Sequence, residues 1–208
     1  MASRKGFHPT QIVAGAFTAI ILLGTFLLWL PISAAQGKTT GFMDALFTST
    51  SAVTVTGLGT LDTETHWSMF GHWVIAVLIQ VGGFGIVGFA SLVGYLLEGR
   101  ISLKNKMTTT SEASVAVAPD VKSLLKNIAK LMLGFQLLLL VFLFFRFLTK
   151  YEYSWQDALG HGVFHSIASF NNAGFALYSD SLIGFARDGW IIVPVFITVF
   201  LASLGFPV

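Results

Sequence analysis

Two uncharged, glycine-ended loops hold the residues best suited to chemistry, and that chemistry is cation coordination. The first is TSTSAVTVTGL at Thr48–Leu58, and the second is FHSIASFNNAGF at Phe164–Phe175. Neither loop has an acidic side chain, so backbone carbonyl oxygens must replace the hydration shell of a weakly hydrated cation such as K⁺. Gly57 and Gly174 suit such a backbone because left-handed angles are cheap only for glycine. An ordinary re-entrant turn or a strand-like segment is the alternative.

The two loops are copies of one plan, laid at a constant offset that pairs Gly57 with Gly174. Each follows a short segment compatible with a helix, at Gly41–Thr50 and at Trp155–Ser169, and the second helix is expected to be longer by about one turn. Internal repetition of this kind outranks local detail in assigning a fold. It predicts a first repeat in residues 1–98 and a second in residues 128–208.

The elements that must position these loops are membrane helices. The chain is 54% hydrophobic and 11% charged, with a mean hydropathy of +0.77, far from the values of a soluble domain. A bilayer core of about 30 Å takes roughly 20 helical residues. We therefore predict an all-α membrane protein with spans at Ile12–Leu30, at Trp73–Leu97, at Ile128–Leu148 and from Trp190 to the C-terminus.

Lysine and arginine gather before the first span and in residues 99–127, which read as a linker between the repeats. The positive-inside rule therefore predicts a cytoplasmic N-terminus and a cytoplasmic linker. Both loops then fall on the outer side, where an acidic excess would concentrate cations. A secretory signal peptide is the alternative for the first span.

Other patterns have plainer interpretations. GFGIVG at Gly83–Gly88 satisfies a dinucleotide-binding pattern, but it lies inside an apolar span, where small residues allow helices to approach closely. His161 and His165 have a spacing that suits a metal on a helix, yet packing or hydrogen bonding is favoured. Gln80 and Gln136 are predicted to bond between helices, with an ion path as the alternative. The absence of cysteine excludes a disulfide framework and a thiolate site.

Three stretches, FTSTSAVTVTGLGTLDT, GGFGIVGF and FHSIASFNNAGFALYSDSL, resemble the membrane subunits of the Trk/Ktr/HKT superfamily of potassium transporters, most nearly the Ktr type. The resemblance covers nearly the whole chain. It implies four M1-P-M2 repeats (helix, pore helix, helix) around one pore, of which this sequence holds two. It also implies that the K⁺ filter uses the backbone carbonyls of eight residues: Val55, Thr56, Gly57, Leu58, Asn172, Ala173, Gly174 and Phe175.

The resemblance further implies the function and the partners. The protein would take part in K⁺ uptake across the plasma membrane, in contact with lipid, with no enzymatic activity, no organic cofactor and no nucleic acid. Because only two repeats precede Val208 and the sequence ends inside an apolar run, we expect a truncated chain that needs its missing C-terminal half or a second copy. Complete subunits would form a homodimer regulated by a cytosolic nucleotide-binding ring. A non-conducting fragment and a Na⁺-permeable relative are the alternatives, and channel-like and coupled transport stay open.

Overall fold

The structure, a computed structural model, describes residues 9–35, 37–106 and 121–204. Within these ranges all regular structure is helical, apart from one antiparallel bridge between Ala34 and Trp67. The prediction of an all-α fold is confirmed for this part of the chain. Its elements, in order, are α1 (Pro9–Trp29), η1 (Pro31–Ser33), α2 (Phe42–Val53), α3 (Thr63–His66), α4 (Met69–Lys106), α5 (Val121–Lys150), α6 (Trp155–Phe170), η2 (Ile183–Phe185) and α7 (Gly189–Ser203).

Two of the four predicted spans are helices long and apolar enough to cross a bilayer, among the residues described. They are Met69–Gly88 in α4 and Leu125–Lys150 in α5. The other two, Val13–Trp29 in α1 and Gly189–Ser203 in α7, are apolar but shorter. At 1.5 Å per residue α7 covers about 22 Å, less than the ~30 Å hydrocarbon core. All four predicted spans are thus helical over nearly all the residues that the structure describes, and the last residues of the fourth span lie outside the described part.

Helix α4 is much longer than its apolar run, because it continues from Met69 to Lys106 without interruption. The sequence predicted an end near Leu97, where charged residues begin. A helix needs no apolar residues to continue, and the single Gly99 in its path costs only about 1 kcal/mol. Helix α5 starts at Val121, so part of the predicted linker 99–127 is helical at both of its ends.

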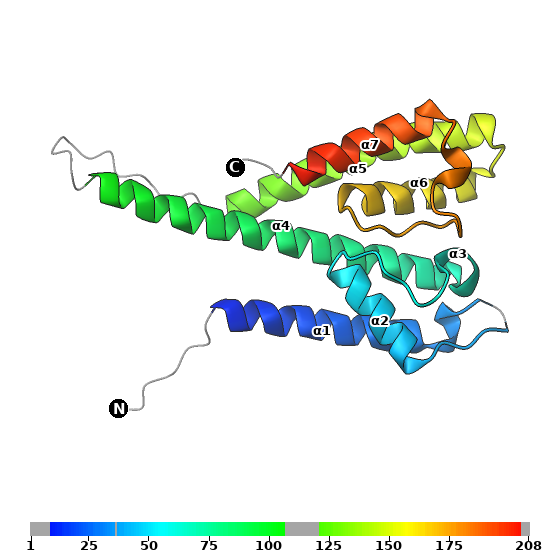
Figure 1. Cartoon of the computed structure of the whole chain (residues 1–208), viewed down its shortest axis with the longest axis horizontal. Coiled ribbons are helices and arrows are strands. Elements are labelled where there is room, and N and C mark those ends of the chain that lie inside the picture. The colour runs from blue at the N-terminus through cyan, green and yellow to red at the C-terminus, as the bar shows by residue number, and fades with distance from the viewer. Residues whose placement is uncertain (1–8, 36, 107–120, 205–208) are drawn as a thin grey trace.

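The short helices α2 and α6 pack among the long ones (Figure 1). Helix α2 lies against α1 and α4, whereas α6 lies against α4, α5 and α7. Helix α4 thus contacts both short helices. The core around α2 and α4 also takes in Ala173 and Phe175 from the segment after α6, so the two halves of the chain share one packed interior.

Large apolar side chains cover the outside of the long helices. Leu23 on α1, Leu137 on α5 and Phe196 on α7 are each 60% exposed or more. Soluble proteins rarely expose contiguous apolar patches of this kind, because they promote aggregation in water. The surface is the one expected for helices surrounded by lipid or by further protein.

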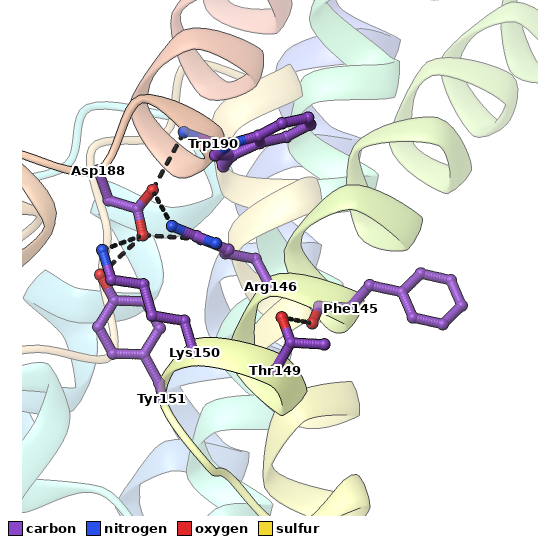
Figure 2. A network of polar contacts seen from close by, with 7 residues as sticks. All are labelled: Phe145, Arg146, Thr149, Lys150, Tyr151, Asp188 and Trp190. Carbon is purple, nitrogen blue, oxygen red and sulfur yellow. Dashed lines mark hydrogen bonds and ion pairs between the residues drawn. The ribbon is translucent and has the colours of Figure 1, made fainter.

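A carboxylate network joins the end of α5 to the start of α7 (Figure 2). Asp188 is only 3% exposed and accepts hydrogen bonds from Arg146 Nε and Nη2 at 2.8 and 2.9 Å. Lys150 Nζ and the Tyr151 hydroxyl donate to the same carboxylate, each at 3.0 Å, and the Trp190 backbone N–H donates at 3.1 Å. The hydrogen bonds from Arg146, Lys150 and Tyr151 stabilise the charged carboxylate by more than burial destabilises it. The pKa of Asp188 therefore lies well below its ordinary value of 3.8.

This network predicts a pH-dependent loss of stability for Asp188→Asn. The lowered pKa means that the contribution of the carboxylate is fully present above its ordinary pKa of 3.8 and is lost as the pH falls toward the lower pKa of the folded state. We expect the substitution to cost about 1–3 kcal/mol at neutral pH, because it removes the buried negative charge that pairs with Arg146 and Lys150. Thermal unfolding in detergent from pH 7 down to pH 3 measures this. A difference between the two proteins that grows on acidification would contradict the prediction.

Candidate functional site

The predicted first loop, Thr48–Leu58, is helical up to Val53, where α2 ends, so its irregular backbone begins only at Thr54. The end of α2 lies three residues beyond the predicted Thr50, because the Thr54 N–H bonds back to the Thr50 carbonyl at 2.9 Å. The chain then turns left-handed at Val55 (φ 57°) and at Gly57 (φ 76°). Within this turn the Thr56 N–H donates to the carbonyl of Ser51 at 2.9 Å.

The second loop repeats this geometry after α6, which ends at Phe170. Asn172 (φ 55°) and Gly174 (φ 71°) turn left-handed, with the same spacing as in the first loop. The Asn171 N–H bonds to the carbonyl of Ile167 at 3.1 Å, and the Ala173 N–H bonds to that of Ala168 at 2.8 Å. They correspond, position by position, to the bonds that Thr54 and Thr56 make in the first loop. Helix α6 has 16 residues and α2 has 12, which confirms the prediction of one extra turn.

The two loops meet at their glycines. A Cβ added to Gly57 would lie 2.5 Å from the carbonyl oxygen of Ala173 and 2.8 Å from the Cα of Gly174. A Cβ added to Gly174 would lie 3.0 Å from the Cα of Gly57. Since real Cβ atoms do not approach backbone so closely, neither position accepts a side chain without displacing the opposite loop.

A cleft of about 200 Å³ lies beside this contact and is lined by both loops. Gly57, Gly174 and Phe175 line it, together with residues that follow the loops, such as Asp62 and Ser181. The other predicted site residues belong to the same two loops but do not line this cleft: Val55, Thr56, Leu58, Asn172 and Ala173. The paired Leu58 and Phe175 also differ, because Leu58 is 61% exposed whereas Phe175 is 7% exposed and belongs to the core.

The segments after the loops are joined by a contact that the sequence did not indicate. The Glu64 carboxylate accepts hydrogen bonds from the Ser179 N–H at 2.7 Å and from the Ser179 hydroxyl at 2.9 Å. Asp62 accepts a bond from the Thr65 N–H at 2.7 Å and so caps α3. Part of the acidic excess predicted to attract cations therefore also has a structural role.

Helix α4 touches the bases of both loops through neighbouring glycines. A Cβ on Gly82 would overlap the carbonyl oxygen of Val53, and one on Gly83 would overlap the side-chain oxygen of Asn171. The interpretation of the GFGIVG pattern as a close-approach surface is thereby confirmed. Gln136 donates to Gln80 at 2.8 Å, which confirms the predicted bond between these two helices.

The two histidines of α6 have packing roles. The Nδ1 of His165 bonds to the carbonyl of His161 at 2.8 Å, and its Nε2 accepts from the Leu177 N–H at 3.3 Å. Both rings stack on Tyr178. In the described part of the chain no three histidine, aspartate or glutamate side chains are grouped to hold a metal ion. The preferred interpretation of hydrogen bonding and packing is confirmed, and His165 anchors the segment that follows the second loop.

The chain is similar to proteins that are named for potassium uptake. Ktr system potassium uptake protein B of Bacillus subtilis is 36% identical over 202 residues, which are 97% of this chain and 44% of the relative. Potassium/sodium uptake protein NtpJ of Enterococcus hirae is 35% identical over 203 residues, 98% of this chain and 45% of the relative. Ktr system potassium uptake protein B of Vibrio alginolyticus is 34% identical over 204 residues, 98% of this chain and 44% of the relative.

The chain spans less than half the length of these three relatives. The family described as TrkH, cation transport protein, matches residues 3–208 and so includes both loops and the helices around them. The chain therefore belongs to the TrkH family of cation transport proteins.

Proposed function

We propose that this chain forms half of a K⁺ pathway, in which the loops around Gly57 and Gly174 are two of four parts of a carbonyl filter. The observation that carries this proposal is the matched geometry of the loops. Both have left-handed backbone at the same two positions and the same hydrogen bonds to the preceding helix, and they meet at their glycines. Residues 55–58 and 172–175 would supply the carbonyl oxygens, as in filters that replace a hydration shell.

The helices before the loops suit this role by their length and direction. At 1.5 Å per residue α2 covers about 18 Å and α6 about 24 Å, so neither reaches across a bilayer core. Their C-terminal ends would therefore lie within the membrane and present negative dipole ends to a cation. Irregular backbone at that depth is stable only where protein, water or ions satisfy it. The helices α1, α2 and α4 would form one M1-P-M2 repeat and α5, α6 and α7 the other, joined by residues 99–127.

The complete transporter would place the N-terminus and this linker in the cytoplasm of a plasma membrane. Cations would collect at the acidic outer side, lose water at the loops and pass inward. Half of a four-part ring cannot enclose an ion, so the remaining repeats must come from further sequence or from a second copy. By resemblance to the Ktr type, complete subunits would pair as a homodimer and bind a cytosolic nucleotide-binding ring.

Growth of K⁺-uptake-deficient cells on limiting K⁺ tests this function. We expect rescue when the chain is expressed together with the C-terminal repeats of a relative in one reading frame, and no rescue when residues 1–208 are expressed alone. Membrane extracts must contain similar amounts of both proteins. Failure of the combined protein to take up K⁺, although it reaches the membrane, would reject the proposal. Rescue by residues 1–208 alone would instead indicate pairing of two copies.

Transport of both K⁺ and Na⁺ is a second candidate function. It is supported by the 35% identity to a relative named for potassium and sodium uptake. The glycine at position 57 favours K⁺, because in this superfamily serine at the first-loop position accompanies sodium transport in some plant relatives. Uptake measured with K⁺ and Na⁺ in competition distinguishes the two functions. In a strictly K⁺-selective pathway, an excess of Na⁺ does not reduce K⁺ uptake.

A further inference from the structure

A cluster of three side-chain amides lies at the base of the second loop. Gln80 of α4 accepts two hydrogen bonds on one oxygen, Oε1, from Gln136 Nε2 of α5 at 2.8 Å and from Asn171 Nδ2 at 3.2 Å. Asn171 also donates to the carbonyl of Ile167, one turn earlier in α6, at 2.9 Å. The cluster thus connects three helices through one acceptor.

The surroundings leave these amides few other partners. Gln136 is 6% exposed, and Gly83 lies one turn after Gln80 on the same face of α4. Because Gly83 has no side chain, α4 approaches so closely that the Asn171 side chain fills the place of a Cβ. Asn171 is therefore held by a hydrogen bond at Gln80 and by direct packing at Gly83.

The position of Asn171 determines where the second loop begins. It caps α6 and directly precedes Asn172, the first left-handed residue of the loop. The Asn172 side chain in turn donates to the hydroxyl of Ser203 on α7 at 3.0 Å. Two consecutive residues at the start of the loop are thus bonded to two other helices, α4 and α7.

Among the described residues, no hydrogen bond joins the irregular part of the first loop to a neighbouring helix. Thr54, which corresponds to Asn171, donates to its own helix at the Thr50 carbonyl and pairs with the Thr56 hydroxyl at 2.6 Å. The Leu58 N–H bonds to the hydroxyl of Ser51 at 2.9 Å. The hydrogen bonds of this part of the first loop therefore go to its own pore helix, whereas those of the second loop also reach α4 and α7.

We infer that Gln80 is a positioning residue for the second loop, so that the placement of α4 determines ion selectivity through Asn171. This inference rests on the proposed function, because it assumes that the second loop is part of the filter. Gln80 acts through Asn171 and binds no ion itself. Gln136 supports the contact between α4 and α5 but does not bond to the loop.

Three substitutions in the complete transporter test this role. Gln80→Met keeps the size of the side chain and removes the acceptor, whereas Asn171→Ala removes the donor but keeps the bond between Gln80 and Gln136. Gln136→Met is the matched control, since it breaks a hydrogen bond of the same cluster without touching the loop. We expect the first two to reduce the preference for K⁺ over Na⁺ about fivefold, the size of effect that one lost interhelical hydrogen bond supplies. Gln136→Met should keep the wild-type preference.

The readouts are the ratio of K⁺ to Na⁺ uptake and the melting temperature of the purified protein. If selectivity and melting temperature fell together in all three variants, the cluster would only hold the helices together. That result would overturn the inference. Unchanged selectivity in Gln80→Met and Asn171→Ala would also overturn it. If Gln80→Met fails to fold, Asn171→Ala decides alone. A wild-type protein without K⁺ uptake would instead reject the proposed function.

Discussion

Gly57→Ser in the complete transporter should reduce the preference for K⁺ over Na⁺ by about tenfold or more, the equivalent of 1.4 kcal/mol. Gly57 has a φ of 76°, where a residue with a Cβ is strained by roughly 1–2 kcal/mol. Its Cβ would also lie 2.5 Å from the Ala173 carbonyl oxygen, so the second loop must move. Competition between K⁺ and Na⁺ for uptake measures the change.

Gly37→Ser is the matched control for this substitution. Gly37 has the same φ of 76°, but a Cβ there would meet nothing within 4 Å. It therefore imposes the same left-handed strain without a collision, and the K⁺ preference should stay at the wild-type value. If Gly57→Ser kept its preference at a similar protein level, Gly57 would not belong to the filter.

Gly82→Ala should be strongly destabilising, although alanine normally favours a helix. Its Cβ would overlap the carbonyl oxygen of Val53 and lie 2.7 Å from the carbonyl carbon, so α4 must separate from the end of α2. Overpacking of this kind costs about 1–3 kcal/mol. At roughly 2–4 °C per kcal/mol, thermal unfolding in detergent should show a clear fall in melting temperature.

The same substitution at Gly134 supplies the comparison. Gly134 lies within α5, and a Cβ there would meet nothing within 4 Å. Alanine should therefore be neutral or stabilising at this position, by up to about 1 kcal/mol from helix propensity. Equal melting temperatures for the two variants would show that α4 does not pack closely on α2.

The sequence predicted the features that depend on local pattern. Repetition of a glycine-ended loop located both turns, and the spacing before each glycine predicted that α6 exceeds α2 by one turn. Apolarity located all four spans within the helices α1, α4, α5 and α7, but α4 extends beyond its apolar run to Lys106. An apolar run indicates which residues can lie in lipid. The ends of a helix depend instead on local hydrogen bonding and on residues such as Pro31, which follows α1.

The contacts between distant residues could not be predicted in this way. The bond from Ser179 to Glu64 and the bond from Asn171 to Gln80 join segments far apart in the sequence. No spacing rule relates such pairs, because their distance depends on how whole helices pack. Gln80 was noticed as a polar residue in an apolar span, but its partner on the loop became apparent only from the fold.

The unbroken course of α4 has a mechanical consequence. Its far end at Lys106 lies about 35 Å along the helix axis from Gly82 and Gly83, at 1.5 Å per residue. A continuous helix transmits a pull or a twist along its axis, and these two glycines touch the bases of both loops. A displacement of the distant end would therefore move the bases of both loops together.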